Sequence, residues 1–301
     1  MDQSPIWTPN NLDVRSTKLW RFMEKQAQKY SVSFENSEDF YRWSVEHPEK
    51  FWSDLWEEVG ILGDKDPRSI LKTDPIFYKN RFFEGSTLNY GANLLKGPDH
   101  SEALVFWGED QVKRRLTMGE LRQGVATFQN NFKKMGVGFS DRVAAFMPNM
   151  PETIQAMIAS ASLGAIWASC SPDFGVQGVL DRFSQIEPKI LITVDGYYYK
   201  GKIIDLSEKI AQIVEQLPSL QEVILISYVR IDSWRKIPKC RSFKDIERMT
   251  QGGSLNFLDV PFNHPLFIMF SSGTTGAPKC IVHGHGGTLI QHMKEHQLHS
   301  N

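Results

Sequence analysis

Residues 266–279 read Leu266-Phe-Ile-Met-Phe270-Ser-Ser-Gly-Thr-Thr-Gly-Ala-Pro-Lys279, and this stretch decides the fold. The apolar run Leu266–Phe270 predicts a strand. The small residues after it predict a loop rich in backbone N–H and hydroxyl donors, which ends in one lysine. A strand that carries such a loop to the edge of a sheet is a typical way to bind an anion, above all a phosphate.

The residues of this loop have separate roles in a predicted ATP phosphate site. Hydroxyl groups come from Ser271, Ser272, Thr274 and Thr275. Gly273 and Gly276 let the backbone turn so that N–H groups converge, and Lys279 adds a positive charge. Only Ala277-Pro278 separates Gly276 from Lys279, so the spacing excludes the Walker A loop, and it is not G-x-G-x-x-G either. P-loop NTPases and Rossmann dehydrogenases are therefore disfavoured; an ordinary Ser/Gly turn is the weaker alternative.

From about Glu102 the sequence alternates between predicted strands and helices. The expected strands are 104–107, 142–147, 166–168, 189–194, 223–226 and 266–270, and the expected helices are 121–135, 152–163, 179–186, 203–216 and 242–247. Thr117 and Glu120 have capping-box spacing, and Gly136 suits a helix end. Apolar strands without alternation, separated by helices, predict an α/β fold with a parallel sheet covered on both faces.

Residues up to about Lys96 have a different character, because tryptophan and phenylalanine crowd them. Phe40, Trp43, Phe51 and Trp56 fall at spacings that predict amphipathic helices. Ser37-Glu-Asp resembles a helix N-cap with acidic residues in the first turn. We interpret the aromatic side chains as packing anchors, with ligand stacking as the weaker alternative.

Composition excludes several classes of function. The net charge of −1 gives no electrostatic reason to expect binding to nucleic acid or to an anionic membrane. No apolar run approaches the ~20 residues that span a bilayer. The first residues lack a signal-peptide pattern. The three cysteines, Cys170, Cys240 and Cys280, are far apart, which favours reduced thiols in the cytosol over disulfides. Packing is the expected role of Cys170 and Cys280.

The loop resembles the phosphate-binding signature of the adenylate-forming superfamily, which includes acyl-CoA synthetases, peptide-synthetase adenylation domains and luciferases. Residues 83–95 and 282–287 are similar to signatures of its acetyl-CoA synthetase branch. Residues 167–175, 181–189, 264–279 and 287–296 resemble the acetoacetyl-CoA synthetases within that branch. Gly91-Ala92 departs from the branch, where Ala-Glu is usual, and the glycine is expected to loosen a helix start.

The resemblance implies a two-step reaction. Acetoacetate would attack the α-phosphorus of ATP with Mg²⁺ present, and coenzyme A would then take the acyl group from the adenylate; acetate, propionate or another short-chain acid remains an alternative substrate. It also implies a helical segment at residues 1–98 and the first part of an AMP-binding domain at residues 99–301. The catalytic residues are expected beyond Asn301, so the chain alone is expected to be inactive, and a non-catalytic nucleotide-binding fragment is the alternative. Lipid and ketone-body metabolism are the implied setting.

Three further groups of residues are weaker candidates. Lys200 and Lys202 lie where the resemblance places basic residues near the phosphates of coenzyme A, although a solvated turn is the simpler interpretation. His292 and His296 are four residues apart, which could place them on one helix face, but no other metal motif accompanies them and no metal site is predicted. Asp173 could line an acyl pocket, although a loop turn is the preferred interpretation.

Overall fold

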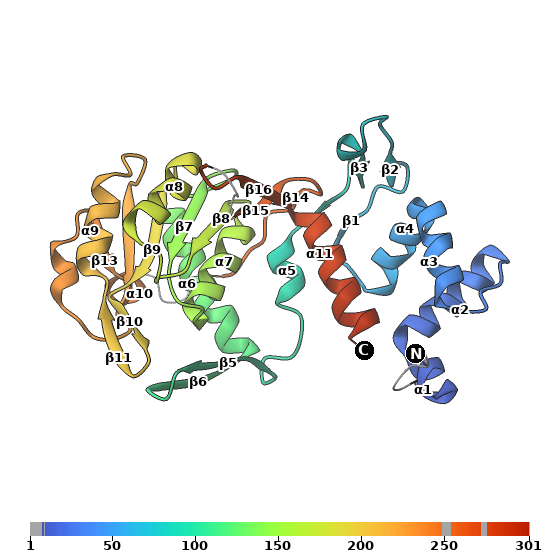
Figure 1. Ribbon diagram of the computed structural model, residues 1–301, viewed down its shortest axis with the longest axis horizontal. Helices are drawn as coiled ribbons and strands as arrows, with labels where there is room; N and C mark the ends of the chain where they lie inside the picture. Colours follow the sequence, from blue (N-terminus) through green and yellow to red (C-terminus); the bar gives the residue numbers. More distant parts are fainter. Residues whose placement is uncertain (1–7, 9, 249–253, 272–275, 301) are drawn as a thin grey trace, which may run out of the picture.

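The computed structural model describes residue 8 and residues 10–248, 254–271 and 276–300. A seven-stranded sheet forms the larger part of the molecule (Figure 1). Its order is β13 (Cys240–Ser242), β12 (Glu222–Ile226), β9 (Ile190–Val194), β7 (Arg142–Phe146), β8 (Ile166–Cys170), β15 (Pro265–Phe270) and β16 (Cys280–Gly284). All neighbouring strands pair in parallel except β15 and β16, which are antiparallel. The predicted parallel sheet is confirmed, with an antiparallel hairpin at one edge.

Helices cover both faces of this sheet. They are α6 (Met118–Lys134), α7 (Pro151–Ser162), α8 (Val176–Ile186), α9 (Ser207–Glu215) and α10 (Phe243–Arg248), with the 3₁₀ turn η2 (Ser233–Lys236) after β12. Right-handed crossovers place α7 on one face and α8 and α9 on the other. All five residues of β9 are buried, as expected for a strand covered on both sides. The capping box of Thr117 and Glu120 is present at the start of α6.

Two hairpins outside the main sheet correct the predicted elements. β5 (Glu102–Gly108) pairs with β6 (Val112–Thr117), a strand that the sequence pattern did not predict. β10 (Gly196–Tyr199) pairs with β11 (Lys202–Asp205), so the helix expected from residue 203 starts only at Ser207. The reason is the turn at Lys200 and Gly201, whose φ angles of 50° and 75° reverse the chain in two residues.

The N-terminal segment is helical, as predicted. It contains α1 (Asn11–Ser16), α2 (Lys18–Tyr30), α3 (Ser37–Glu46) and α4 (Pro48–Glu58). The predicted cap at Ser37 is wrong by one residue, because the side chain of Asn36 accepts the hydrogen bond from the Asp39 N–H at 3.0 Å. The aromatic side chains pack together: Phe22 meets Phe40 and Phe51 edge to face, with ring centroids 6.0 and 5.9 Å apart. This confirms their role as packing anchors.

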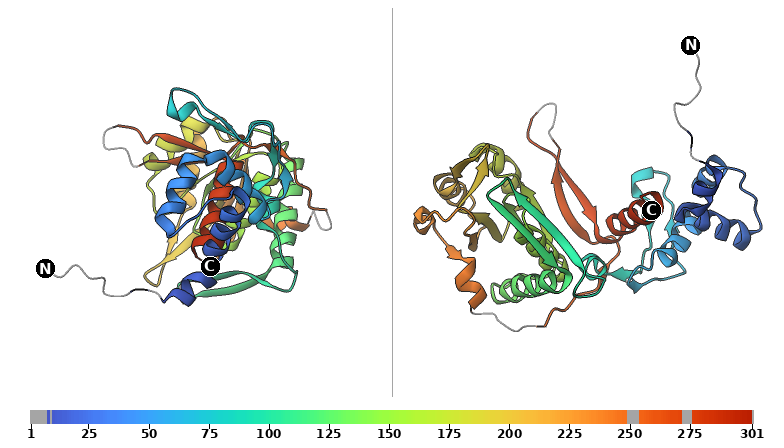
Figure 2. Two further views of the ribbon diagram at one scale, coloured as in Figure 1. Left: turned by 90° about the vertical axis from the view of Figure 1, so that its right-hand side faces the viewer. Right: turned by 90° about the horizontal axis from the view of Figure 1, so that it is seen from below.

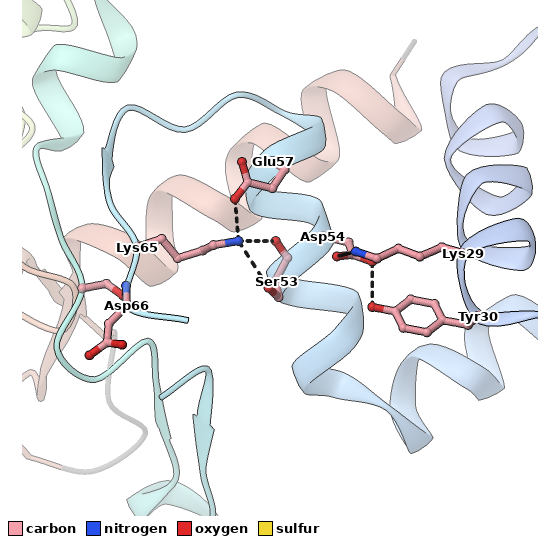
Figure 3. A network of polar contacts seen from close by, with 8 residues as sticks. Lys29, Tyr30, Ser53, Asp54, Glu57, Lys65 and Asp66 are labelled. Atoms are coloured by element: carbon pink, nitrogen blue, oxygen red, sulfur yellow. Dashed lines mark hydrogen bonds and ion pairs between the residues drawn. The ribbon is translucent and has the colours of Figure 1, made fainter. Parts of the chain in front are cut away.

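Polar contacts join α4 to its neighbours on two sides (Figure 3). Asp54 accepts hydrogen bonds from Lys29 at 2.6 Å and from Tyr30 at 3.0 Å, both from the end of α2. The bond to Asp54 raises the pKa of Lys29, and burial raises the pKa of Tyr30. On the other side Lys65 contacts Glu57 at 2.5 Å. The helix is thereby fixed between α2 and the chain that follows it.

Short elements connect the two parts. They are β1 (Gly63–Asp64), β2 (Leu71–Lys72), the 3₁₀ turn η1 (Phe77–Lys79), β3 (Arg81–Phe82), β4 (Thr87–Leu88), α5 (Tyr90–Leu94), β14 (Val260–Pro261), α11 (His285–Lys294) and the π-helical turn η3 (Glu295–His299). α5 and α11 lie between the sheet and the N-terminal helices (Figure 1). None of the helices in the described ranges is long and apolar enough to cross a membrane. A boundary at residues 98 and 99 stays a prediction.

Candidate phosphate-binding site

The predicted loop connects the antiparallel strands β15 and β16. The ladder ends with Phe270 opposite Cys280, and the Ser271 N–H donates to the Lys279 carbonyl at 3.1 Å. Figure 2 shows this hairpin as an arm that projects from the sheet. Three of the seven predicted residues lie in the described part of this hairpin and its loop: Ser271, Gly276 and Lys279. Ser272, Gly273, Thr274 and Thr275 lie outside the described residues.

The loop lies at the edge of the sheet where ligands of α/β proteins bind. β15 runs parallel to β8, with Phe267 opposite Trp167. The loop after β15 and residues 171–175 after β8 therefore leave the sheet at the same carboxyl edge. Strand order also reverses here, because β8 and β9 lie on opposite sides of β7. Such a reversal at the carboxyl edge is the usual place for a binding crevice.

Two described loop residues suit an anion. Gly276 has a φ of +95°, a conformation that residues with a Cβ rarely adopt, and no atom of the described residues lies within 4 Å of a Cβ added there. Lys279 is exposed, and its ammonium forms no ion pair within residues 10–248, 254–271 and 276–300. An exposed cation beside a backbone turn can meet a phosphate without breaking an existing contact.

Lys200 and Lys202 lie at the tip of the β10–β11 hairpin and are exposed. The Glu109 carboxylate accepts hydrogen bonds from the backbone N–H groups of Lys200 at 2.7 Å and Gly201 at 2.9 Å. These contacts hold the turn against the β5–β6 hairpin rather than against the phosphate loop. A role for the two lysines in binding coenzyme A stays a prediction.

A buried aspartate orders the same edge of the sheet, and the sequence pattern did not reveal it. Asp195 follows β9 and has no exposed surface. Its carboxylate accepts hydrogen bonds from the N–H groups of Tyr228 at 2.8 Å, Val229 at 2.9 Å and Ile231 at 3.0 Å. A carboxylate with several N–H donors is well satisfied without water, so Asp195 fixes the chain after β12.

The histidines after the loop divide into two groups. His292 and His296 are exposed on one face of the chain, with ring centroids 6.5 Å apart, and His292 Nδ1 lies 3.2 Å from the Tyr90 hydroxyl. No group of three metal-binding side chains occurs within the described ranges. His285, by contrast, is fully buried, and its Nε2 atom has no hydrogen-bond partner there. Burial, with the nearby His264, lowers the pKa of His285 to about 3.

The other weak candidates have ordinary surroundings. Cys170 is buried, and burial raises the pKa of its thiol to about 11, as expected for a packing residue. Cys280 was expected to pack as well, which is wrong, because it starts the edge strand β16 and is exposed. Asp173 is exposed in a turn after β8. Gly91 packs close to α7: an added Cβ would lie 3.1 Å from Ile158 Cγ2.

Comparison with protein families matches residues 93–300 to the model of the AMP-binding enzymes, which takes in the sheet, the loop and α11. The chain belongs to the AMP-binding enzyme family. Residues 37–94 match the model of the acetyl-coenzyme A synthetase N-terminus. The predicted phosphate loop therefore lies within the first match, and α3, α4 and α5 lie within the second.

Individual relatives agree with this assignment. The chain is 43% identical to acetoacetyl-coenzyme A synthetase of Rhizobium meliloti over 300 residues, which cover 99% of this chain and 46% of that protein. It is 43% identical to acetoacetyl-CoA synthetase of Macaca fascicularis, covering 98% of this chain and 45% of that protein. The solved acetoacetyl-CoA synthetase of Streptomyces lividans superposes with a TM-score of 0.90 at 33% identity and covers 99% of this chain. The chain spans about half the length of the relatives it matches.

Proposed function

We propose that this AMP-binding chain forms part of an acid–thiol ligase that activates acetoacetate. In the first step the acetoacetate carboxylate attacks the α-phosphorus of ATP and pyrophosphate leaves. In the second step the thiol of coenzyme A attacks the acyl-adenylate, giving acetoacetyl-CoA and AMP. The observation that carries the proposal is the loop between Phe270 and Cys280 at the carboxyl edge of the sheet. Relatives named acetoacetyl-CoA synthetase support the choice of acid.

The loop would act on the β- and γ-phosphates of ATP. Charge develops on phosphoryl oxygens during the first step, and fixed donors aimed at them lower the barrier. Lys279 would supply a positive charge, Ser271 a side-chain hydroxyl, and Gly276 the turn. The catalytic residues of both steps are proposed to lie in the part of the relatives that this chain does not cover.

Magnesium would enter bound to ATP. The described residues contain no group of three carboxylate, cysteine or histidine side chains that could hold an ion. Among the described residues of the loop, 271 and 276–279, Ser271 carries the one side-chain oxygen that could contact Mg²⁺, and phosphate oxygens would supply other ligands. The ion would neutralise phosphate charge, while Lys279 and the loop backbone orient the triphosphate.

The thiol substrate would approach from the β10–β11 hairpin. Lys200 and Lys202 are exposed there and could pair with the phosphates of coenzyme A. The reaction would belong to lipid and ketone-body metabolism in the cytosol, in keeping with the three cysteines and the absence of a disulfide between those the structure describes.

A second short-chain acid is the alternative substrate. The chain is 37% identical to malonamoyl-CoA synthetase vrtB of Penicillium aethiopicum, covering 95% of this chain and 42% of that protein. The name of that relative specifies a different acyl group, which supports testing more than one acid. Acetate and propionate complete the panel of acids to be compared.

The test is acetoacetate-dependent release of pyrophosphate. The protein for this test, called the extended protein below, is residues 1–301 joined to the remaining part of the Rhizobium meliloti relative. Release with acetoacetate should exceed release with acetate, propionate or malonamate. No acetoacetate-dependent release from a folded extended protein would refute the proposal.

The chain of 301 residues alone is proposed to be inactive, because it spans less than half of its relatives. The alternative is a nucleotide-binding module without turnover. Calorimetric titration of this chain with ATP separates the two. Weak or undetectable binding fits an incomplete site, whereas sub-millimolar binding would support the nucleotide-binding module.

A further inference from the structure

The chain that leaves the phosphate loop, residues 278–284, is called the stem here. Gln185 of helix α8 contacts it. The Gln185 amide donates a hydrogen bond from Nε2 to the Pro278 carbonyl at 2.8 Å. The Cys280 thiol donates to Gln185 Oε1 at 3.6 Å. Pro278 and Cys280 are the two neighbours of Lys279 along the chain. A single amide group therefore contacts the backbone of the residue before the loop lysine and the side chain of the residue after it.

This amide is itself held in place. Gln185 Nε2 also donates to the Asp181 carbonyl, one turn earlier in α8, at 2.6 Å. The same helix reaches the other end of the loop, because the rings of Phe183 and Phe270 lie 6.4 Å apart. Phe183 has no exposed surface and anchors α8 in the core. α8 thus contacts the strand that enters the loop and the stem that leaves it.

The stem has few other restraints. β16 is the last strand of the sheet, and among the described residues it pairs with β15 alone. All of Cys280, Ile281, Val282 and His283 are exposed. A lysine that stabilises developing phosphate charge is effective only if its backbone is already in position, because reorganisation during the reaction costs rate. The stem therefore needs a support from outside the hairpin, and Gln185 supplies a contact of that kind.

We propose that Gln185 is a positioning residue that fixes the stem of the phosphate loop and so sets the place of the Lys279 ammonium. The proposal rests on the proposed phosphate-binding role of the loop. It assigns a function to Gln185, one residue of the stretch 181–189 that resembles the acetoacetyl-CoA synthetases. Gln185 acts through Pro278 and Cys280 and does not touch the substrate.

The first experiment tests the contact between Gln185 and Cys280 in the 301-residue chain. It measures the rate at which the Cys280 thiol is alkylated. Buried Cys170 serves as an internal reference in mass spectrometry. Gln185→Leu removes the acceptor and should raise the rate about threefold or more. Gln185→Glu should lower it, because a carboxylate beside the thiol disfavours the thiolate. Gln177→Leu is the matched control, since Gln177 bonds Asp181 on the same helix, away from the loop, and should change nothing.

Opposite shifts for the two Gln185 variants support the contact. An unchanged rate for Gln185→Leu, or shifts in the same direction for both variants, would overturn it. Gln185 is exposed, so neither variant should prevent folding. An unchanged thermal midpoint in both variants would separate a local effect on the stem from a general loosening of the protein.

The second experiment tests whether Gln185 positions Lys279 in the extended protein, and it measures KM values. Gln185→Leu and Gln185→Glu both lose the donor to Pro278, so both should raise the KM for ATP on the order of tenfold. The KM for acetoacetate should stay the same, a split that a purely structural role would not produce. An active Gln185→Leu enzyme with an ATP KM within about twofold of wild type would overturn the proposal. An inactive wild-type extended protein would instead refute the proposed function, and the alkylation rates would then decide the Gln185 contact alone.

Discussion

His285 shows how one buried side chain makes stability depend on pH. It starts α11 without exposed surface, His264 lies 5.6 Å away between ring centroids, and the Tyr90 N–H donates to its Nδ1 atom at 3.4 Å. Its pKa is about 3 in the folded chain against 6.5 ordinarily. The unfolded chain therefore binds a proton at a pH where the folded chain does not, and stability is lost as the pH falls below 6.5.

The prediction is a difference in pH dependence between wild type and His285→Ala. Between pH 7 and pH 5 this histidine should cost the wild type about 2 kcal/mol of unfolding free energy, and the variant should be spared that loss. Urea unfolding across this range measures the difference. His100→Ala, at an exposed histidine, is the control and should keep the wild-type slope. Parallel curves for wild type and His285→Ala would contradict the assigned protonation.

Lys279 and His285 differ in how far the sequence predicts the surroundings of a single residue. The proposed role of Lys279 follows from its neighbours along the chain, since a local order of small residues after a strand is enough to predict a phosphate loop. The surroundings of His285 come from Tyr90, 195 positions earlier, and from His264. The four histidines near it in sequence are exposed, so composition could not single it out.

Asn89 joins three elements at the start of α5. Its Oδ1 atom accepts from the Gly91 N–H at 2.9 Å, and its Nδ2 atom donates to the carbonyls of Ala161 at 2.9 Å and Leu258 at 2.7 Å. The side chain is almost fully buried. It caps a helix and satisfies two carbonyls from α7 and from the segment before β14.

Replacing this side chain should destabilise the protein strongly. Asn89→Ala leaves two carbonyls without that donor and removes a cap, so we expect a loss of about 3 kcal/mol. Asn263→Ala is a matched control, because Asn263 is exposed and makes one bond to the Phe82 carbonyl. It should cost less than about 1 kcal/mol. Equal losses in thermal unfolding would show that Asn89 does not join these elements.

The edge strand β16 exposes apolar side chains. Ile281 and Val282 are 45% and 56% exposed, and Met269 on β15 is 51% exposed. A strand that has a partner on one side only, with apolar side chains exposed, favours pairing with another chain. The 301-residue chain should therefore self-associate, and Ile281→Lys with Val282→Lys should reduce this without lowering the thermal midpoint. Sedimentation at several concentrations measures it; a monomeric wild type would contradict the prediction.

Elements were predictable where their pattern is local. The helix after Thr117 has its cap, its apolar spacing and its glycine end in consecutive residues, and it forms as expected. The β10–β11 hairpin was missed because Ile203 and Ile204 continue the apolar spacing of α9. Left-handed φ angles at Lys200 and Gly201 override that pattern. A non-glycine residue in this conformation leaves no clear mark in sequence.

At the scale of the molecule, the N-terminal helices and the AMP-binding part share one core cluster. Trp56 stacks on Phe262 with centroids 6.0 Å apart, and Phe83 lies 4.8 Å from the same ring. Leu289 of α11 and Leu298 of η3 are buried in this cluster too. Both parts could be predicted from the composition of the sequence. The surfaces through which they pack together could not, because the contacts join residues about 200 positions apart, such as Trp56 and Phe262, and periodicity carries no information about such pairs.

The proposed function requires that the phosphate loop take part in the activation of an acid by ATP. The most direct measurement is acetoacetate-dependent exchange of labelled pyrophosphate into ATP by the extended protein, in wild type and Lys279→Ala. We expect exchange in the wild type and a loss of about a hundredfold or more in the variant, because one charge at the reacting phosphates is gone. Lys25→Ala, which removes an exposed ion pair to Glu58, should exchange normally. A wild-type rate of exchange in Lys279→Ala would contradict a role of the loop lysine in this reaction.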